Sequence, residues 1–355
     1  MNRNDSTATD SRRAPGAAGV SLLAMGLLAT RAARRRRRRY SFRNRSVIIT
    51  GGARGFGFAL AHRLAREGAQ LSLLARTGAD LERALFRLQA LGAVVAAFEC
   101  DVRDERAVRR TVDDVVDLRG RIDVLINNAG VIQMTPFEHA AHHDFADSLQ
   151  THFWGPLYAI QACLPHLRET RGRILNITSI GGRVAVPHLI PYCVGKFATV
   201  ALSEGLHAEL ARDGIVVTTA SPGLMRTGSH RNVIVRGLHK TEARLFGAMS
   251  ATPVTSMGAD RAARMVLDAV RSGRAHVSPG WQARMLETMH ALAPELLATL
   301  MAVAAVRLLP GAAQDAGGDQ ARLSRDLDLG AVTSVFPSGA AAAFNQPVAR
   351  GETRP

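Results

Sequence analysis

Thr50-Gly51-Gly52-Ala53-Arg54-Gly55-Phe56-Gly57 is a glycine-rich turn between a short β-branched run, Val47–Thr50, and a helical pattern, Phe56–Glu67. Glycines at a strand-to-helix junction let the backbone turn tightly and approach a diphosphate, which then lies against the N-terminus of the helix. The spacing from Gly51 to Gly55 is one residue wider than in the common dinucleotide-binding motif. The turn alone therefore leaves two interpretations, a dinucleotide site and an ordinary tight turn.

Short apolar strands and helical patterns alternate after this turn. Such alternation indicates a parallel sheet that is covered by helices on both faces. The sequence thus predicts an α/β fold, with a doubly wound parallel sheet of about seven strands over residues 46–280. The expected strands after the first are Leu71–Leu74, Val94–Phe98, Val124–Ile126, Ile174–Ile177, Ile215–Thr219 and His276–Ser278.

The composition excludes several classes of protein. The chain has 355 residues, of which 47% are hydrophobic and 21% are charged, and it is too apolar for a disordered protein. Residues 1–45 hold twelve Arg and two Asp, so the rest of the chain carries only +5 of the net charge of +15. The body is therefore not expected to bind nucleic acid. The three cysteines are widely spaced and odd in number, which predicts free thiols and no metal site.

The N-terminal residues 1–45 form a separate region. Ala14–Thr30 lacks charge and precedes the run Arg34–Arg39. Seventeen helical residues span about 25 Å, slightly less than a hydrocarbon core of about 30 Å. We expect this anchor-like region to associate with a membrane and to keep the body on the cytoplasmic side, because the positive charge follows the apolar stretch. Two alternatives remain: the segment lies on anionic lipid without spanning it, or it is an extension with no membrane role.

The C-terminal part divides into two regions. Residues 281–311 are predicted to be apolar and helical, and the helix Pro294–Leu309 is apolar on every side. Such a helix must be buried against its own domain, a second copy of the chain or lipid, and we expect a homo-oligomer. Residues 312–355 are predicted to be a disordered tail.

Charged and polar residues follow the second, third and fourth strands. Where an NAD site would place a carboxylate against the ribose, this chain has Ala75 followed by Arg76. Together with Arg54, Arg76 would suit a 2′-phosphate and therefore NADP, unless both are solvated surface residues. Asp101-Val102 could flank the adenine or cap a helix. Asn127-Asn128-Ala129-Gly130 could tie neighbouring strands together or form a plain turn.

Three further residues could carry acid–base chemistry. Ser179 follows the fifth strand, and Tyr192 precedes Lys196 by four residues, a spacing that places both on one face of a helix. A phenol titrates near pH 10 in water, and a neighbouring positive charge lowers its pKa. Tyr192 would then act as an acid–base group near neutral pH, while Ser179 orients the same substrate oxygen. Taken alone, Tyr192 and Lys196 could equally be an ordinary exposed pair.

The order of these motifs from Arg45 to Ser278 resembles that of the short-chain dehydrogenase/reductase family. The resemblance implies a Rossmann-type domain, a nicotinamide cofactor and hydride transfer between the nicotinamide and a carbonyl or secondary alcohol. It also implies that Tyr192 is the general acid–base, that Ser179 holds the substrate oxygen, and that Lys196 binds the nicotinamide ribose and lowers the pKa of Tyr192. The implied cofactor-binding residues are Gly51, Arg54, Gly55, Phe56, Gly57, Arg76, Asp101, Val102, Asn128, Ala129, Gly130, Tyr192, Lys196, Pro222, Gly223 and Thr227.

One catalytic position departs from the family. Many members have an Asn that holds a water in a proton relay to the Lys, whereas the corresponding residue here, three before Gly155, is His152. Imidazole can also hold a water and titrates near neutral pH, so we expect the relay to be altered and not lost. The alternative is that His152 only fills space.

The sequence therefore predicts an NADP(H)-dependent oxidoreductase. Val186–Pro191 and the apolar segment from Leu224 to Pro253 are expected to select a lipophilic carbonyl or alcohol, unless these residues simply pack as a lid. An alternative function is an NADPH-binding scaffold or redox-responsive regulator with little turnover, which would have no use for the complete Ser179, Tyr192 and Lys196 set. A membrane or nucleic-acid tether with a vestigial domain fits only the Arg run.

Overall fold

The computed structural model describes residues 40–311, 320–327 and 342–346. The predicted N-terminal anchor lies almost wholly outside these residues, so its relation to a membrane stays a prediction. Among the helices that the structure does describe, none is both long enough and apolar enough to cross a bilayer.

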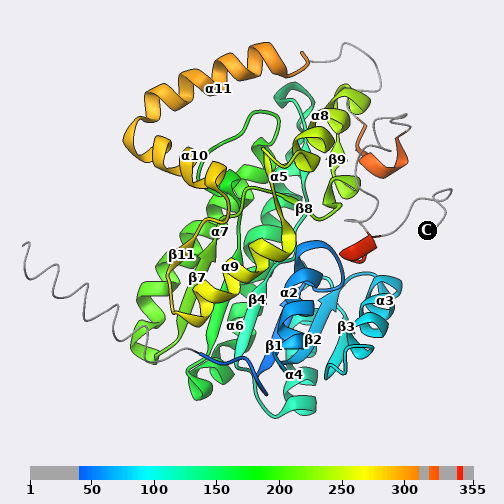
Figure 1. Cartoon of the computed structure of the whole chain (residues 1–355), viewed down its shortest axis with the longest axis vertical. Helices are drawn as coiled ribbons and strands as arrows, with labels where there is room; N and C mark the ends of the chain where they lie inside the picture. The colour runs from blue at the N-terminus through cyan, green and yellow to red at the C-terminus, as the bar shows by residue number, and fades with distance from the viewer. Residues whose placement is uncertain (1–39, 312–319, 328–341, 347–355) are drawn as a thin grey trace, which may run out of the picture. The chain divides into compact units, whose positions relative to one another are not determined.

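Seven parallel strands form the central sheet, in the order β11-β7-β6-β4-β1-β2-β3 (Figure 1). This arrangement confirms the predicted doubly wound α/β fold, and the short run at His276 does form the seventh strand. The strands are β1 (Ser46–Thr50), β2 (Gln70–Ala75), β3 (Val95–Glu99), β4 (Val124–Asn127), β6 (Arg173–Ile177), β7 (Val216–Ala220) and β11 (His276–Val277).

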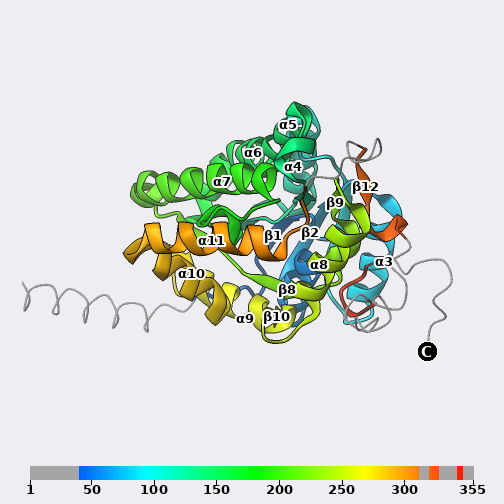
Figure 2. The same ribbon diagram turned by 90° about the horizontal axis from the view of Figure 1, so that it is seen from above.

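Helices cover both faces of this sheet. Figure 2 shows α4 (Glu105–Arg119), α6 (Gly155–Thr170) and α7 (Ile190–Glu209) on one side and α9 (Ala259–Arg271) on the other. On the second side α9 packs against α2 (Gly55–Arg66), which in turn contacts α3 (Gly78–Gln89). Each helix turns an apolar stripe toward the sheet, as valines 108, 112 and 115 of α4 do. These two layers fix the carboxyl ends of the strands along one edge.

A smaller set of elements lies beyond that edge. It comprises α5 (His142–Leu149), the paired strands β8 (Leu224–Arg226) and β10 (Ser256–Gly258), the helix α8 (His239–Ala251), and a three-stranded sheet of β5 (Gln133–Met134), β9 (Ile234–Val235) and β12 (Arg322–Leu323). A separate apolar cluster lies among β5, β9 and α8, with Met134, Val233 and Phe246 buried in it. We call residues 224–258 the substrate-side segment.

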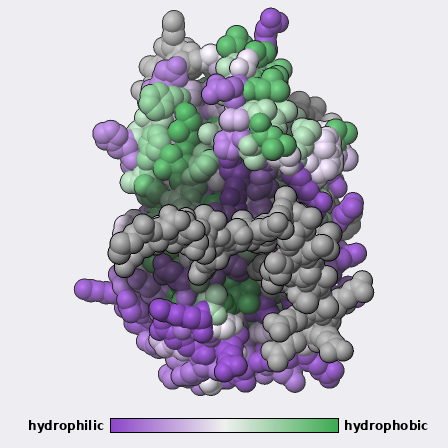
Figure 3. Space-filling view, turned by 90° about the vertical axis from the view of Figure 1, so that its left-hand side faces the viewer, coloured by the Kyte–Doolittle hydropathy of each residue, from purple (hydrophilic) through white to green (hydrophobic). Residues whose placement is uncertain are grey.

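The predicted apolar C-terminal helix is present as α11 (Pro294–Leu308), preceded by α10 (Trp281–Leu292). Leu297 is the buried residue of α11, whereas Leu296, Val303 and Val306 are 54%, 53% and 82% exposed. Figure 3 shows the side of the molecule on which α10 and α11 lie, and hydrophobic residues gather in the upper half of this view. Among the described residues, the body of the protein therefore covers the Leu297 side of this helix and leaves much of its apolar surface exposed.

Parts of the predicted disordered tail are ordered. β12 pairs in antiparallel register with β9, and Ser324, just after it, is buried. Residues 342–346 lie against α2 and α3 (Figure 1), and both Asn345 and Gln346 are buried. The prediction of disorder is therefore wrong for these two segments, because hydrogen bonds to distant residues hold them. The rest of the tail lies outside the described residues.

Candidate active site

The glycine-rich turn joins β1 to α2 at the sheet edge. Gly51 has φ +63°, and a Cβ there would lie 2.8 Å from the Cα of Ala129. At Gly57 a Cβ would lie 2.2 Å from the carbonyl oxygen of Gly51. Only glycine fits where backbones approach so closely. The turn is thus held tightly against the segment that follows β4.

The N-terminus of α2 is suited to an anion. Its N-cap residue, Arg54, makes no side-chain capping hydrogen bond, and the first turn of the helix contains no acidic residue. The backbone N–H groups of a helix's first turn lack partners within the helix and carry partial positive charge. Together with the close-packed glycines, they fit the diphosphate of a dinucleotide.

Two amides after β4 fix the geometry of this edge. The Nδ2 of Asn128 donates to the carbonyl oxygens of Thr50 and Gly51 at 3.1 and 3.0 Å. The Nδ2 of Asn127 donates to the Oδ1 of Asn176 on β6 at 2.9 Å. These bonds tie β4 to both of its neighbours, which is the strand-linking interpretation of the Asn-Asn-Ala-Gly motif and not that of a plain turn.

The fold brings Ser179, Tyr192 and Lys196 together at the ends of β6 and α7. The Nζ of Lys196 donates to the carbonyl oxygen of Ile177 at 3.0 Å and lies 5.8 Å from the centroid of the Tyr192 ring. The Oγ of Ser179 accepts from the backbone N–H of Gly181 at 3.1 Å. A Cβ on Gly181 would lie 3.2 Å from Cε1 of Tyr192, so the phenol packs on the turn that Ser179 begins.

Burial dominates the electrostatics of this pair. Burial raises the pKa of Tyr192 above its ordinary value, and the hydrogen bond with Ser179 acts in the opposite direction. Burial also lowers the pKa of Lys196 to about 7. The shift at Tyr192 is opposite to the one expected from the Lys196 charge alone, since desolvation of the phenolate is its largest cause. In this state Tyr192 is a neutral phenol at neutral pH and can donate a proton.

His152 lies beside this group in a five-residue π-helical turn, Gln150–Trp154, between α5 and α6. Its Nε2 lies 2.9 Å from the carbonyl oxygen of Val131, which can only accept, so Nε2 carries the hydrogen. Its Nδ1 is buried, and no described residue hydrogen-bonds to it. Burial and the Lys196 charge lower the pKa of His152 well below its ordinary value. The imidazole is therefore neutral and presents a free acceptor.

The space that this acceptor borders is shared with Lys196. A Cβ on Gly130 would lie 2.8 Å from Cε1 of His152, 3.4 Å from its Nδ1 and 3.7 Å from the Nζ of Lys196. The Tyr192 ring meets the imidazole edge to face, with centroids 5.4 Å apart. His152 therefore stands in the same cluster as the other three predicted catalytic residues.

Arginines gather at the end of β2. Arg54 pairs with the buried Asp80 at 3.3 Å, and Arg83 contacts the same carboxylate. Burial lowers the pKa of Arg54, and the positive charges of Arg325, Arg76 and Arg83 lower it further while Asp80 raises it. Arg76 is exposed. The sequence indicated Arg54 and Arg76, but neither Arg83 nor Arg325 was part of any motif.

Asp101 and Val102, after β3, differ in role. Asp101 pairs with Arg103 at 2.7 Å. It does not cap α4, because the carboxylate of Asp104 does so by accepting from the backbone N–H of Arg106 at 2.9 Å. The capping alternative for Asp101 is therefore wrong. Val102 is buried at the same edge.

The segment after β7 reaches the catalytic cluster. The backbone N–H of Ile180 donates to the carbonyl oxygen of Pro222 at 2.9 Å, and that of Gly223 donates to Pro279 at 3.4 Å. Thr227 is buried close by. Pro222 and Gly223 thus lead into the substrate-side segment, which contains Thr227, beside the turn that carries Ser179.

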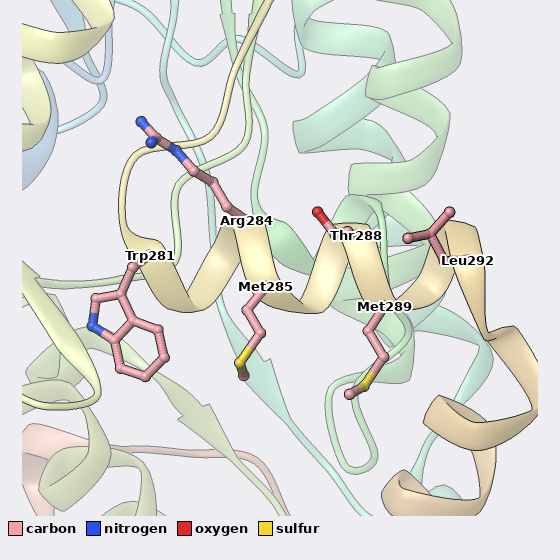
Figure 4. A pocket seen from close by; sticks show the side chains of 6 residues that line it. All are labelled: Trp281, Arg284, Met285, Thr288, Met289 and Leu292. Carbon is pink, nitrogen blue, oxygen red and sulfur yellow. The ribbon is translucent and has the colours of Figure 1, made fainter.

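Other features of the described residues bear on the chemistry. No group of three or more His, Cys, Asp or Glu side chains there could hold a metal ion, and all three cysteines are buried free thiols. A surface hollow of about 470 Å³ is lined by α10 alone (Figure 4), from Trp281 to Leu292. None of the predicted catalytic residues lines it.

Comparisons with known proteins agree with this geometry. The family model for short chain dehydrogenase matches residues 45–235. An 11-beta-hydroxysteroid dehydrogenase-like protein, 4A of Arabidopsis thaliana, is 34% identical over 254 residues, which are 71% of this chain and 81% of that protein. SadH of Mycobacterium tuberculosis is 30% identical over 277 residues, 77% of this chain and 99% of SadH.

A solved structure gives the same result. The short-chain dehydrogenase from Streptomyces avermitilis superposes with a TM-score of 0.64 at 26% identity, and the match covers 74% of this chain and 97% of that one. Sequence, fold and the arrangement at the sheet edge therefore agree, and the chain belongs to the short-chain dehydrogenase/reductase family of oxidoreductases.

Proposed function

We propose that this protein is an NADP(H)-dependent oxidoreductase that transfers hydride between the nicotinamide and a carbonyl or secondary alcohol of a lipophilic substrate. The observation that carries the proposal is the cluster of Ser179, Tyr192 and Lys196, in which Lys196 is buried and lies 5.8 Å from the Tyr192 ring. Burying an ammonium is unfavourable, and such perturbed groups gather at functional sites. A pure binding module would gain nothing from this arrangement.

The reaction needs a hydride and a proton. NADP(H), held by the glycine-rich turn and the residues after β4 and β7, would supply or accept the hydride at C4 of its nicotinamide. Tyr192, a neutral phenol at neutral pH, donates the proton to the substrate oxygen, which Ser179 orients by a hydrogen bond. Lys196 places a titrating ammonium beside the phenol, and the neutral His152 offers Nδ1 as an acceptor in the space that both border. A proton that passes through this space, between Lys196 and His152, would replace the one that Tyr192 donates to the substrate.

The preference for NADP rests on charge. β2 ends at Ala75, which cannot bind ribose hydroxyls as a carboxylate does, and the guanidiniums of Arg76 and Arg83 repel that of Arg54 at this site. Asp80 neutralises only part of this charge. A 2′-phosphate would relieve the remaining repulsion between the arginines, so NADP is favoured over NAD.

The lipophilic substrate is inferred from the substrate-side segment. Val233 and Phe246 are buried in the segment's own apolar cluster, so they act as packing residues there. Ile132, Leu189 and Leu224 are only partly buried around this cluster and remain available to a ligand. Their apolar character favours a bulky hydrophobic carbonyl or alcohol over a sugar.

The test is the loss of NADPH absorbance when the detergent-solubilised full chain is mixed with a panel of hydrophobic ketones and aldehydes. Turnover should be faster with NADPH than with NADH. Tyr192→Phe should reduce kcat by about 10²–10⁴-fold and leave NADPH binding intact, because only the proton donor is removed. Full activity in this variant would contradict the mechanism. Tight NADPH binding without turnover on any carbonyl would favour the regulator with little turnover.

We also propose that residues 1–39 associate with the cytoplasmic face of a membrane. The support is the uncharged stretch Ala14–Thr30 followed by Arg34–Arg39. Deleting residues 1–39 should move the protein from the membrane fraction to the supernatant. An unchanged distribution would contradict this role.

A further inference from the structure

The C-terminal residues 342–346 lie directly on the glycine-rich turn. The backbone N–H of Gly55, the first residue of α2, donates to the carbonyl oxygen of Phe344 at 2.7 Å. The Nδ2 of Asn345 donates to the carbonyl oxygen of Ala53 at 2.6 Å. Asn345 and Gln346 are only 4% and 5% exposed. These contacts involve the backbone of the turn itself.

Other parts of the domain hold the same five residues. Arg87 of α3 donates to the carbonyl oxygens of Ala342 and Ala343 at 2.7 and 2.9 Å. Asn232, in the substrate-side segment, donates to the Oε1 of Gln346 at 2.8 Å. Figure 1 shows this short segment beside α2 and α3, far along the chain from both. Three separate regions of the domain thus form a docking site for residues 342–346.

This docking site overlaps the place where a dinucleotide would bind. A diphosphate on the turn needs the N–H groups at the start of α2, and Phe344 already takes that of Gly55. Asn345 also donates to the carbonyl oxygen of Asp80 at 3.2 Å, and the carboxylate of Asp80 holds Arg54. The chain's own atoms therefore occupy the start of α2, on the diphosphate side, and contact the backbone of Asp80, whose carboxylate pairs with Arg54 on the 2′-phosphate side.

We propose that residues 342–346 compete with NADP(H) for the glycine-rich turn, so that the C-terminal segment sets the apparent affinity of the enzyme for its cofactor. This inference rests on the proposed function, since it requires that NADP(H) binds at the turn. When only a fraction of a protein is in its binding-competent state, the apparent Kd for the ligand equals the intrinsic Kd divided by that fraction. Displacement of the segment must accompany cofactor binding, and anything that removes the segment must strengthen binding.

The first experiment compares NADPH binding by the full chain and by a variant that ends at residue 341, using the fluorescence of bound NADPH. We expect the Kd to fall about tenfold on truncation, because the competing segment is gone. An unchanged Kd would overturn the competition. A higher Kd would also overturn it and would make the segment a part of the cofactor site. If neither form binds NADPH or NADH, the proposed function fails and this inference fails with it.

A second variant loosens the segment without removing it. Arg87→Gln removes two hydrogen bonds to the segment from a residue outside the catalytic and cofactor-binding sets, and should lower the Kd for NADPH about threefold. Arg109→Gln is the matched control, because Arg109 is an exposed helix residue that pairs only with Glu105 among the described contacts. Equal Kd values for the two variants would contradict the docking.

Hydrogen exchange gives a readout independent of both variants. In the full chain, saturating NADPH should increase amide exchange at residues 342–346 while it decreases exchange at the start of α2. Protection of both segments by NADPH would overturn the competition, because it would mean that the cofactor and the segment bind together.

Discussion

Lys196 shows how strongly one buried charge can affect the protein. Its pKa is about 7 in the fold and about 10.5 when exposed, so the folded state loses its proton first. Below pH 7 both states are protonated, and the full cost of burying the ammonium opposes folding. As the pH rises from about 7 to 10.5, the unfolded state binds more protons, and this cost is progressively relieved.

Lys196→Met should therefore raise the free energy of unfolding most at pH 7 and below, and its advantage should shrink as the pH rises toward 10.5. The slope is at most about 1.4 kcal/mol per pH unit, the value for one proton. Urea denaturation of both proteins across this range measures the difference, in which the contributions of groups that do not interact with Lys196 cancel. A constant difference would show that Lys196 titrates at its ordinary value.

The role of His152 can be separated from simple space filling. His152→Asn keeps a hydrogen-bond acceptor beside Lys196. His152→Leu removes the acceptor but fills a volume similar to that of the imidazole. We expect kcat to stay within about tenfold in the first variant and to fall about a hundredfold in the second. Steady-state kinetics with the best substrate of the panel checks this, with the thermal midpoint as a control for folding. Equal kcat values for the two variants would support the space-filling alternative.

At the residue scale, the sequence predicted which side chains would meet but not their charge states. The four-residue spacing of Tyr192 and Lys196 and the position of Ser179 after a strand were sufficient to place them on one edge of the sheet. The pKa directions depend on how much water the surrounding elements exclude, which no local spacing encodes. Similarly, Asp101 and Asp104 both precede α4, and only the backbone geometry determines that Asp104 is the cap.

At the element scale, a buried hydrogen bond from α8 and an ion pair just before it attach this region to the catalytic side. Glu242 of α8 is fully buried, and its Oε1 lies 2.7 Å from the Nδ1 of His188. His188 precedes Tyr192 and has φ +62°, a backbone conformation that side chains rarely adopt. Arg236, just before α8, pairs with the buried Asp144 of α5 at 3.1 Å. These pairs hold the substrate-side segment against the loop expected to select the substrate.

Breaking the first pair should loosen substrate binding more than cofactor binding. Glu242→Ala leaves His188 without its partner, so we expect a KM for the lipophilic substrate at least about tenfold higher, with little change in the Kd for NADPH. Lys240→Ala is the matched control, because Lys240 is an exposed residue of the same helix. An unchanged substrate KM in Glu242→Ala would show that the pair is not needed for the substrate site.

Most regular elements were predictable because their signals are local. The seven strands of the sheet appear as apolar runs, and α11 follows from Pro294 and the apolar stretch after it. The ordered pieces of the tail were not predictable. β12 is two residues long, and residues 342–346 are held by Arg87 and Asn232, which lie more than 100 residues away in the chain. Nothing within the tail's own sequence marks these contacts.

At the scale of the whole molecule, the uncovered side of α11 requires an explanation. Leu296, Leu300 and Val303 are exposed and lie four and three residues apart, which places them on one face of the helix. Large exposed apolar patches mark interaction sites. We call Leu296, Leu300 and Val303 the seam, because a single apolar row at this spacing is typical of helices that pair with another helix. The hollow along α10 adds the exposed Trp281 and Met285 to the same region (Figure 4).

We therefore expect two copies of the chain to associate through α11. Leu300→Glu combined with Val303→Glu places two charges on the seam and should convert a dimer to a monomer in sedimentation velocity at micromolar concentration. Ala298→Glu combined with Ala302→Glu is the matched control, because both alanines are exposed on the opposite side of the same helix. If the control dissociates equally, the seam is not the interface. If the unmodified chain is a monomer that binds lipid vesicles, and the seam variant does not, then α11 contacts a membrane instead, since a charged seam would be excluded from lipid as it is from a second copy.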